Sequence, residues 1–168
     1  MKLYFAIVWT AFALVNCGGG AQENSAEANG TSLQTTEETK PKITGKKIEL
    51  TISSDDQMQF DKREMTVGEG QEVTVILKHI GKMSKEVMGH NWVLLHQGTS
   101  ITDYAMKALD AKEKEYLPEE IPVIAATNMI GGGETTSITF QAPAKGTYDF
   151  ICSYPGHYGL MKGKFIVQ

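Results

Sequence analysis

Three residues near the C-terminus offer donor atoms that suit a soft metal ion. Cys152, His157 and Met161 follow one another as C-x4-H-x3-M within a segment rich in turn-forming residues. A single loop can therefore present a thiolate, an imidazole and a thioether to one point. Sulfur ligands of this kind favour Cu(I), and imidazole is also a good copper ligand. The spacing predicts a copper site with this loop as its main source of ligands.

This loop is short of one strong ligand. A trigonal copper site uses two His and one Cys with a weakly bound axial Met, so a second His must come from elsewhere. His90 is the candidate, because Gly89 before it permits a close backbone approach at the start of a β-rich run. Taken singly, each of these residues is more often a buried thiol, a core methionine or a surface histidine. Their combination carries the prediction.

Short β-strands are the elements that must position these residues. Alternating apolar and polar residues mark 48–52, 73–77, 147–151 and 164–167, and β-rich runs cover 64–67, 91–96, 122–127 and 135–141. Turn signals rich in glycine separate several of them. About eight strands at this spacing favour an all-β antiparallel sandwich or barrel.

One helix is predicted within residues 99–117. Thr99 or Ser100 can serve as its N-cap, and Pro118 ends the stretch. Its apolar face consists of Ile101, Tyr104, Ala105, Ala108 and Leu109. We expect this helix to lie against the sandwich.

The first 43 residues differ in composition from the rest. A short cationic start and an apolar run at 4–15 indicate a signal peptide, since a membrane span needs about 20 apolar residues. The segment 14–17 resembles the lipobox of bacterial lipoproteins, whose Cys is acylated, although Asn16 stands where that family has Gly, Ala or Ser. Residues 18–43 are polar and read as a flexible tether.

The domain organisation follows from these segments. We predict a lipoprotein signal peptide at 1–17 with lipid attached to Cys17, a tether at 18–43, and the working domain at 44–168. The protein would then be exported and held at the periplasmic face of a bacterial membrane by lipid alone. The rival use of Cys17 is a disulfide with Cys152, because exported proteins meet an oxidising compartment.

Three segments resemble azurin, a blue copper protein of the cupredoxin family. They are 54–60, 87–94 and 154–163, and they occur in the azurin order. The loop from Cys152 to His157 has the azurin length and not the shorter C-x2-H form of plastocyanin-like and pseudoazurin-like proteins. The resemblance covers essentially all of residues 44–168. It implies a Greek-key cupredoxin fold that carries single electrons on one type 1 copper.

The resemblance also implies individual roles around the copper. His90, Cys152 and His157 would be the strong ligands, Met161 the weak axial ligand, and the Gly89 carbonyl an opposing axial oxygen. Beside them would lie Asn91, bracing the ligand loops, and Tyr154, which replaces an azurin Phe. Trp92 matches the buried core tryptophan. His79 matches an azurin histidine near the site, either coupled to the copper's charge by its protonation or simply ending a strand.

The same resemblance implies a docking surface. Met88, Pro155 and Leu160 would form an apolar patch around the edge of His157. The expected partners are redox proteins such as c-type cytochromes or copper- or haem-containing reductases, met by a monomer in small, transient contacts. Tyr158, where azurin has a small residue, changes the rim of this patch. The azurin disulfide near the start of the domain is absent, because residues 44–80 contain no Cys.

Other function classes fit less well. Copper capture or delivery would favour Met-rich or His-rich tracts, which this chain lacks. A copper enzyme would need further His pairs, and only His79 and His96 remain, with His96 assigned to the surface. We therefore predict no enzymatic activity. A net charge of −4 without a basic stripe also makes nucleic acid an improbable partner.

Overall fold

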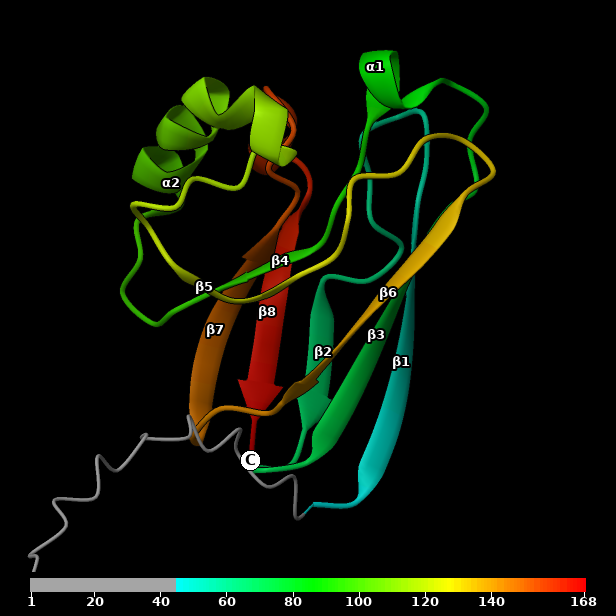
Figure 1. Ribbon diagram of the computed structural model, residues 1–168. Helices are drawn as coiled ribbons and strands as arrows, with labels where there is room; N and C mark the ends of the chain where they lie inside the picture. Colours follow the sequence, from blue (N-terminus) through cyan, green and yellow to red (C-terminus); the bar gives the residue numbers. More distant parts are fainter. Residues whose placement is uncertain (1–44) are drawn as a thin grey trace, which may run out of the picture. The chain divides into compact units, whose positions relative to one another are not determined.

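Two β-sheets form the body of the protein (Figure 1). The computed structural model describes residues 45–168. One sheet has the order β1-β3-β6, and the other has the order β2-β8-β7-β4-β5. The strands are β1 (Lys47–Ser54), β2 (Glu64–Val67), β3 (Glu72–His79), β4 (Val93–Leu95), β5 (Val123–Ala126), β6 (Thr135–Gln141), β7 (Gly146–Ile151) and β8 (Lys162–Val167). This arrangement confirms the predicted Greek-key sandwich of eight strands.

The strand directions are mixed. β1 runs parallel to β3, and β2 runs parallel to β8. The remaining pairs are antiparallel. Parallel neighbouring strands need long connections, so residues far apart in the sequence pair within the same sheet.

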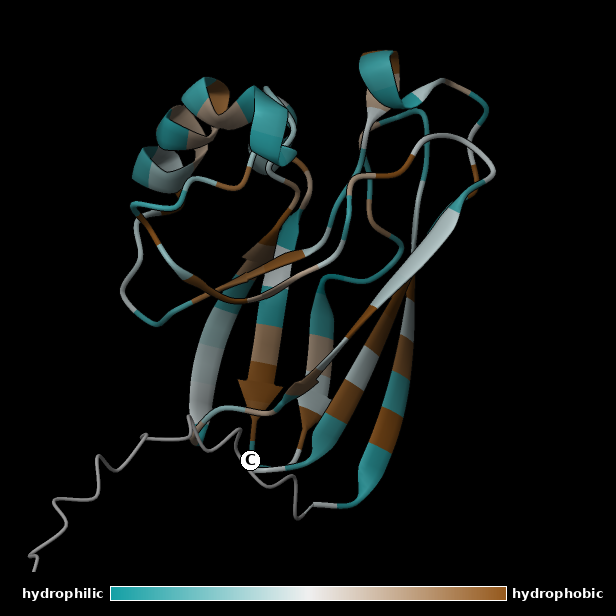
Figure 2. Cartoon of the chain, viewed as in Figure 1, coloured by the Kyte–Doolittle hydropathy of each residue, from teal (hydrophilic) through white to brown (hydrophobic). Residues whose placement is uncertain are grey.

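The alternation seen in the sequence becomes the inner face of each sheet. In β3, Val73, Val75 and Leu77 are fully buried, and Figure 2 shows the corresponding bands of apolar and polar residues along this strand. They meet the second sheet in one core that includes Trp92 and Phe150. The rings of these two residues have centroids 5.7 Å apart. The core thereby fixes the sheets whose ends carry the metal-binding candidates.

The predicted helix is present but changes form half-way. α2 (Ile101–Ala108) begins after Ser100, whose hydroxyl accepts the N–H of Asp103 at 3.2 Å. It continues as the 3-10 helix η1 (Leu109–Lys114). Because the tighter winding changes which residues face inward, Leu109 is 45% exposed and not part of the expected buried face.

Two further short helices lie in loops. α1 (Lys85–Met88) is a single turn that the sequence pattern did not predict, and η2 (His157–Gly159) begins at a candidate ligand. In Figure 1, α1 and α2 both stand at the end of the sandwich opposite the C-terminus. β4 is shorter than the predicted run 91–96, because His90 and the residues after it are held by the neighbouring loop instead of by a regular ladder.

The N-terminal predictions lie outside the described residues. These are the signal peptide, the acylated Cys17, the tether at 18–43 and the alternative disulfide from Cys17. Among residues 45–168, no helix is long and apolar enough to cross a membrane.

Candidate metal centre

Three donor atoms from separate parts of the sequence meet inside the protein. His90 lies just before β4, Cys152 directly follows β7, and His157 begins η2. The Nδ1 atoms of His90 and His157 are 3.2 Å apart, and Cys152 Sγ lies 3.9 and 3.7 Å from them. All three residues are buried, the most exposed being His157 at 3%. The structure thus brings together the three strong ligands inferred from the sequence.

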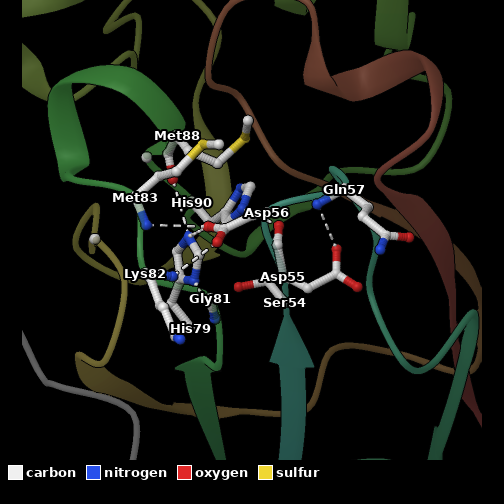
Figure 3. Close-up of polar contacts among 12 residues, drawn as sticks. Ser54, Asp55, Asp56, Gln57, His79, Gly81, Lys82, Met83, Met88 and His90 are labelled. Carbon is white, nitrogen blue, oxygen red and sulfur yellow. Dashed lines mark hydrogen bonds and ion pairs between the residues drawn. The ribbon is translucent and has the colours of Figure 1, made fainter.

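The ring of His90 is oriented from behind by the loop after β1. Its Nε2 lies 2.9 Å from the carbonyl oxygen of Asp55, which can only accept, so Nε2 carries the hydrogen and Nδ1 keeps its lone pair (Figure 3). The Asp55 side chain in turn accepts the N–H groups of Gln57 at 2.9 Å and Gln59 at 3.2 Å. This turn holds the carbonyl in place and thereby fixes the tautomer of His90.

The C-terminal ligand loop is closed by its own backbone. The N–H of Cys152 donates to the Met161 carbonyl at 3.0 Å, and the N–H of Met161 donates to the His157 carbonyl at 2.8 Å. Met161 is fully buried in the same core as Cys152. The loop therefore returns to the point where it left β7, with all three candidate residues turned inward.

Asn91 links the two halves of the site. Its Oδ1 accepts the N–H of Ser153 at 2.9 Å, and its Nδ2 donates to the Ser153 hydroxyl at 2.8 Å. Because Asn91 follows His90 and Ser153 follows Cys152, this pair of bonds sets the distance between the two ligand segments. The expected bracing position of Asn91 is thus matched by its contacts.

Gly89 is required for space. Its carbonyl oxygen lies 3.9 Å from Cys152 Sγ. A Cβ at this position would lie 2.6 Å from the Lys85 carbonyl oxygen and 3.0 Å from both Met129 Sδ and Tyr154 Cδ2. Its φ of −68° is ordinary, so the crowding and not the backbone conformation selects glycine.

Burial controls the protonation of the three donors. It lowers the pKa of His90 and of His157 to about 4, so both imidazoles are neutral at pH 7. Burial also raises the pKa of the Cys152 thiol to about 12, because a thiolate alone in this interior has no water around it. A metal cation reverses this last preference, since a coordinated thiol loses its proton.

His79 forms part of the wall behind His90. It is buried at the end of β3, and its ring centroid lies 4.4 Å from that of His90. The N–H of Gly81 donates to its Nδ1 at 3.0 Å, so its Nε2 hydrogen can donate to the Met88 carbonyl, also at 3.0 Å. Figure 3 shows Asp56 beside it, with a carboxylate oxygen 3.8 Å from Nε2. The structure places His79 in contact with the site, and a proton-coupled role remains a prediction.

Asp56 anchors the loop between β3 and α1, which includes Gly81, a hydrogen-bond partner of His79. Its carboxylate accepts the N–H groups of Lys82 at 2.8 Å and Met83 at 3.2 Å. The bond from Lys82, followed by that from Met83, lowers the pKa of this carboxyl below its ordinary value. The loop before α1 is thereby tied to the loop after β1.

Tyr154 packs against His157, and the residues expected at the rim differ in exposure. The Tyr154 ring centroid lies 4.6 Å from that of His157, and its hydroxyl donates to the Glu86 carbonyl at 2.6 Å. Leu160 is 53% exposed, while Met88 and Pro155 are partly buried. His157 itself is only 3% exposed, so neighbouring groups cover almost all of its imidazole.

Comparison with known proteins decides the family. A profile described as "Copper binding proteins, plastocyanin/azurin family" matches residues 46–168. The chain belongs to the plastocyanin/azurin family. Azurin-1 of Alcaligenes xylosoxydans xylosoxydans is 46% identical over 120 residues, which are 67% of this chain and 91% of that protein.

Auracyanins are also relatives of this azurin-family protein. Auracyanin-A of Chloroflexus aurantiacus is 40% identical over 119 residues, which are 69% of this chain and 71% of that protein. The crystal structure of dithionite-reduced auracyanin from Roseiflexus castenholzii superposes with a TM-score of 0.66 at 37% identity. It covers 74% of this chain and 99% of that one. The cupredoxin fold is therefore shared with solved blue copper proteins.

The donor set of this azurin-family protein fits its family's metal. The point equidistant from the two Nδ1 atoms and Cys152 Sγ lies about 2 Å from each, within the range (about 2.0–2.3 Å) at which His and Cys bind ions such as zinc. Two neutral imidazoles and one thiol match the trigonal copper set. Distances of this size suit zinc as well, so family membership is what selects copper as the cofactor.

Several supporting residues were not found from the sequence. Asp55 acts through its backbone carbonyl, which no side-chain pattern reveals. Ser153 stands directly after Cys152, and its hydroxyl was a signal that could have been paired with Asn91. Glu115 contacts Met129 and the Asn91 side chain from a segment that the sequence marks only as the end of a helix. His96 is exposed, as expected.

The crowding at Gly89 leads to a test with a matched control. We expect Gly89→Ala to push the ligand segment away from Tyr154 and Met129 and to weaken copper binding by at least about tenfold, the scale of changes beside metal ligands. Gly159→Ala should bind copper like wild type, because a Cβ there meets nothing within 4 Å. Competition with a copper chelator measures both. Equal affinities for the two variants would contradict the spatial role of Gly89.

Proposed function

We propose that this protein carries single electrons on a type 1 copper ion held by His90, Cys152 and His157. The buried Met161 would supply the weak axial sulfur, and the Gly89 carbonyl the opposing oxygen. The observation that carries this proposal is the meeting of two imidazole Nδ1 atoms and one thiol sulfur within 4.8 Å of one another. Copper supplies a one-electron couple, and the chain supplies the fixed positions of the donors.

Rigidity and burial favour an electron carrier over a copper-delivery protein. The His90 ring is held by the Asp55 carbonyl, and the Cys152 segment is held by Asn91. Donors that cannot rearrange limit the structural change that accompanies a change of charge. Delivery would favour exposed donors that exchange their metal, and here the three donor residues are at most 3% exposed.

We further propose that partners dock on the apolar rim over His157. The proposed patch consists of Met88, Pro155 and Leu160, which are partly buried or exposed, and it would lie over the buried imidazole of His157. A partner there would reach a copper ligand through few intervening atoms. Redox proteins such as c-type cytochromes or copper- or haem-containing reductases are the proposed class, met by a monomer in small interfaces.

We also propose a lipid anchor at Cys17. The lipobox-like segment 14–17 and the polar stretch 18–43 support this arrangement, because several acyl chains give stable attachment where one chain is marginal. The copper domain would then work at the periplasmic face of a membrane.

The visible spectrum tests the copper proposal directly. Addition of Cu(II) to the purified protein should give a strong blue band that bleaches with a mild reductant and returns with an oxidant. Cys152→Ala should abolish the band because the thiolate that produces it is gone. His96→Ala, a change at an exposed histidine, should leave it intact. A colourless wild-type protein with bound copper would refute the type 1 assignment.

Electron transfer tests the docking patch. Leu160→Asp places a charge in a small apolar interface, where a loss of about 1.4 kcal/mol corresponds to about tenfold weaker association. We expect about tenfold slower reduction by a c-type cytochrome in stopped-flow mixing, with an unchanged blue band. Met106→Asp is the control, since Met106 is 56% exposed on α2 and Leu160 is 53% exposed. Equal slowing by both variants would place docking elsewhere.

Fractionation of bacteria tests the anchor. Cys17→Ser should release the protein from membranes or leave it unprocessed, while the blue band persists because no ligand has changed. Asn16→Gly, which restores a residue usual before the lipobox Cys, should keep the protein on the membrane. Loss of the blue band in Cys17→Ser would instead place Cys17 near Cys152 and overturn the separation of anchor and site.

A further inference from the structure

We propose that Glu115 is a positioning residue for the copper centre, tying the end of η1 to the two segments that carry His90 and Cys152. Its copper readouts rest on the proposed function, whereas the contacts that support it belong to the protein chain alone. Glu115 is not one of the residues that we infer to bind copper.

The Glu115 carboxylate holds the segment that pairs with His90. Its Oε2 accepts the N–H of Met129 at 2.8 Å, and Met129 is only 5% exposed. The next residue, Ile130, exchanges two backbone hydrogen bonds of 2.9 Å with His90. Met129 Sδ also packs against Gly89, where it would lie 3.0 Å from a Cβ. A displacement of Met129 would therefore shift the positions of Gly89 and His90.

The backbone carbonyl of Glu115 reaches the other half of the site. It accepts Asn91 Nδ2 at 3.4 Å, and the same nitrogen donates to the Ser153 hydroxyl at 2.8 Å. The Asn91 amide is thus oriented by η1 on one side and by the residue after Cys152 on the other. One residue outside the ligand set accordingly contacts both supports of the two ligand segments.

The ion pair of Glu115 is the least important of its contacts. Lys85 Nζ lies 3.2 Å from Oε1, but the two side chains are 46% and 38% exposed. Exposed pairs of this kind contribute little. The positioning effect is therefore assigned to the hydrogen bonds with Met129 and Asn91.

The backbone at Glu115 and Tyr116 adopts a left-handed conformation, which is strained for residues other than glycine. Glu115 has φ of 53°, and Tyr116 after it has φ of 61°. Glycine or asparagine is usual where a helix ends in this left-handed conformation. Glycine would relieve the strain at Glu115 but would remove the carboxylate that holds Met129. A glutamate at such a position, with specific contacts to Met129 and Asn91, points to a role beyond ending the helix.

The test compares two changes at Glu115 with one neighbouring change. In the full-length protein, Glu115→Ala removes the acceptor, Glu115→Gln keeps an amide oxygen for the Met129 N–H, and Glu119→Gln is the control. Glu119 pairs with Lys114 at 2.7 Å and is exposed in the same part of the chain. The measurements are the rate of copper loss to excess chelator, the reduction potential, the visible band and the unfolding temperature.

We expect Glu115→Ala to lose copper about tenfold faster or more, as for other changes that loosen the partners of metal ligands, and to shift the visible band and the potential. Glu115→Gln should stay close to wild type, and Glu119→Gln should equal it. In the metal-free protein, the NMR signals of the Asn91 side-chain amide and the His90 N–H should move in Glu115→Ala alone. If Glu115→Ala does not fold, Glu115→Asp, too short to reach Met129, takes its place.

Two outcomes would overturn the role of Glu115. One is a Glu115→Ala variant with wild-type copper loss, spectrum and metal-free NMR signals. The other is equal damage in Glu115→Ala and Glu119→Gln, which would mean a general loss of stability around η1. If the wild-type protein itself took up no copper, the proposed function would fail, while the NMR comparison would still decide whether Glu115 positions Asn91 and His90.

Discussion

The hydrogen bond from His90 Nε2 to the Asp55 carbonyl decides which ring nitrogen faces the other donors. Metal binding requires both Nδ1 atoms, 3.2 Å apart, to direct their lone pairs at one point, and the thiol beside them has no solvent in which to ionise. Such a cluster persists only if the surrounding backbone prevents each ring from turning away. Much of the local structure around His90 can be understood as a means of meeting that requirement.

The two sheets hold the donors in place in different ways. The sheet β1-β3-β6 ends in the loops of Asp55 and His79, which support His90 from behind. The other sheet delivers Cys152 at the end of β7 and returns through Met161 into β8. Asn91 then joins the segments of His90 and Cys152, which lie at the ends of β4 and β7 of this second sheet, with two short hydrogen bonds to Ser153. The donors therefore all belong to segments of the second sheet, whereas the first sheet supplies residues that support His90.

Much of this architecture could be predicted from the sequence, because strand alternation and the spacing from Cys152 to Met161 are local patterns. The eight strands and the meeting of His90, Cys152 and His157 follow from such patterns together with the azurin resemblance. α1 was not predicted, since one turn of helix has too few residues for a periodic signal. Leu109 was expected to be buried, but winding changes at η1. Asp55 and Glu115 act through contacts that depend on tertiary structure and leave no pattern along the chain.

The position of β8 between β2 and β7 has a consequence for how the protein is made. β8 follows every other strand in the sequence, yet it occupies the interior of its sheet and pairs with a strand about a hundred residues earlier. The five-stranded sheet therefore cannot close until β8 has docked between β2 and β7. Because the ligand loop connects β7 to β8, the metal-binding cavity also becomes complete only then. A chain in which β8 has not docked has no finished place for copper, so metal binding is coupled to the docking of this strand.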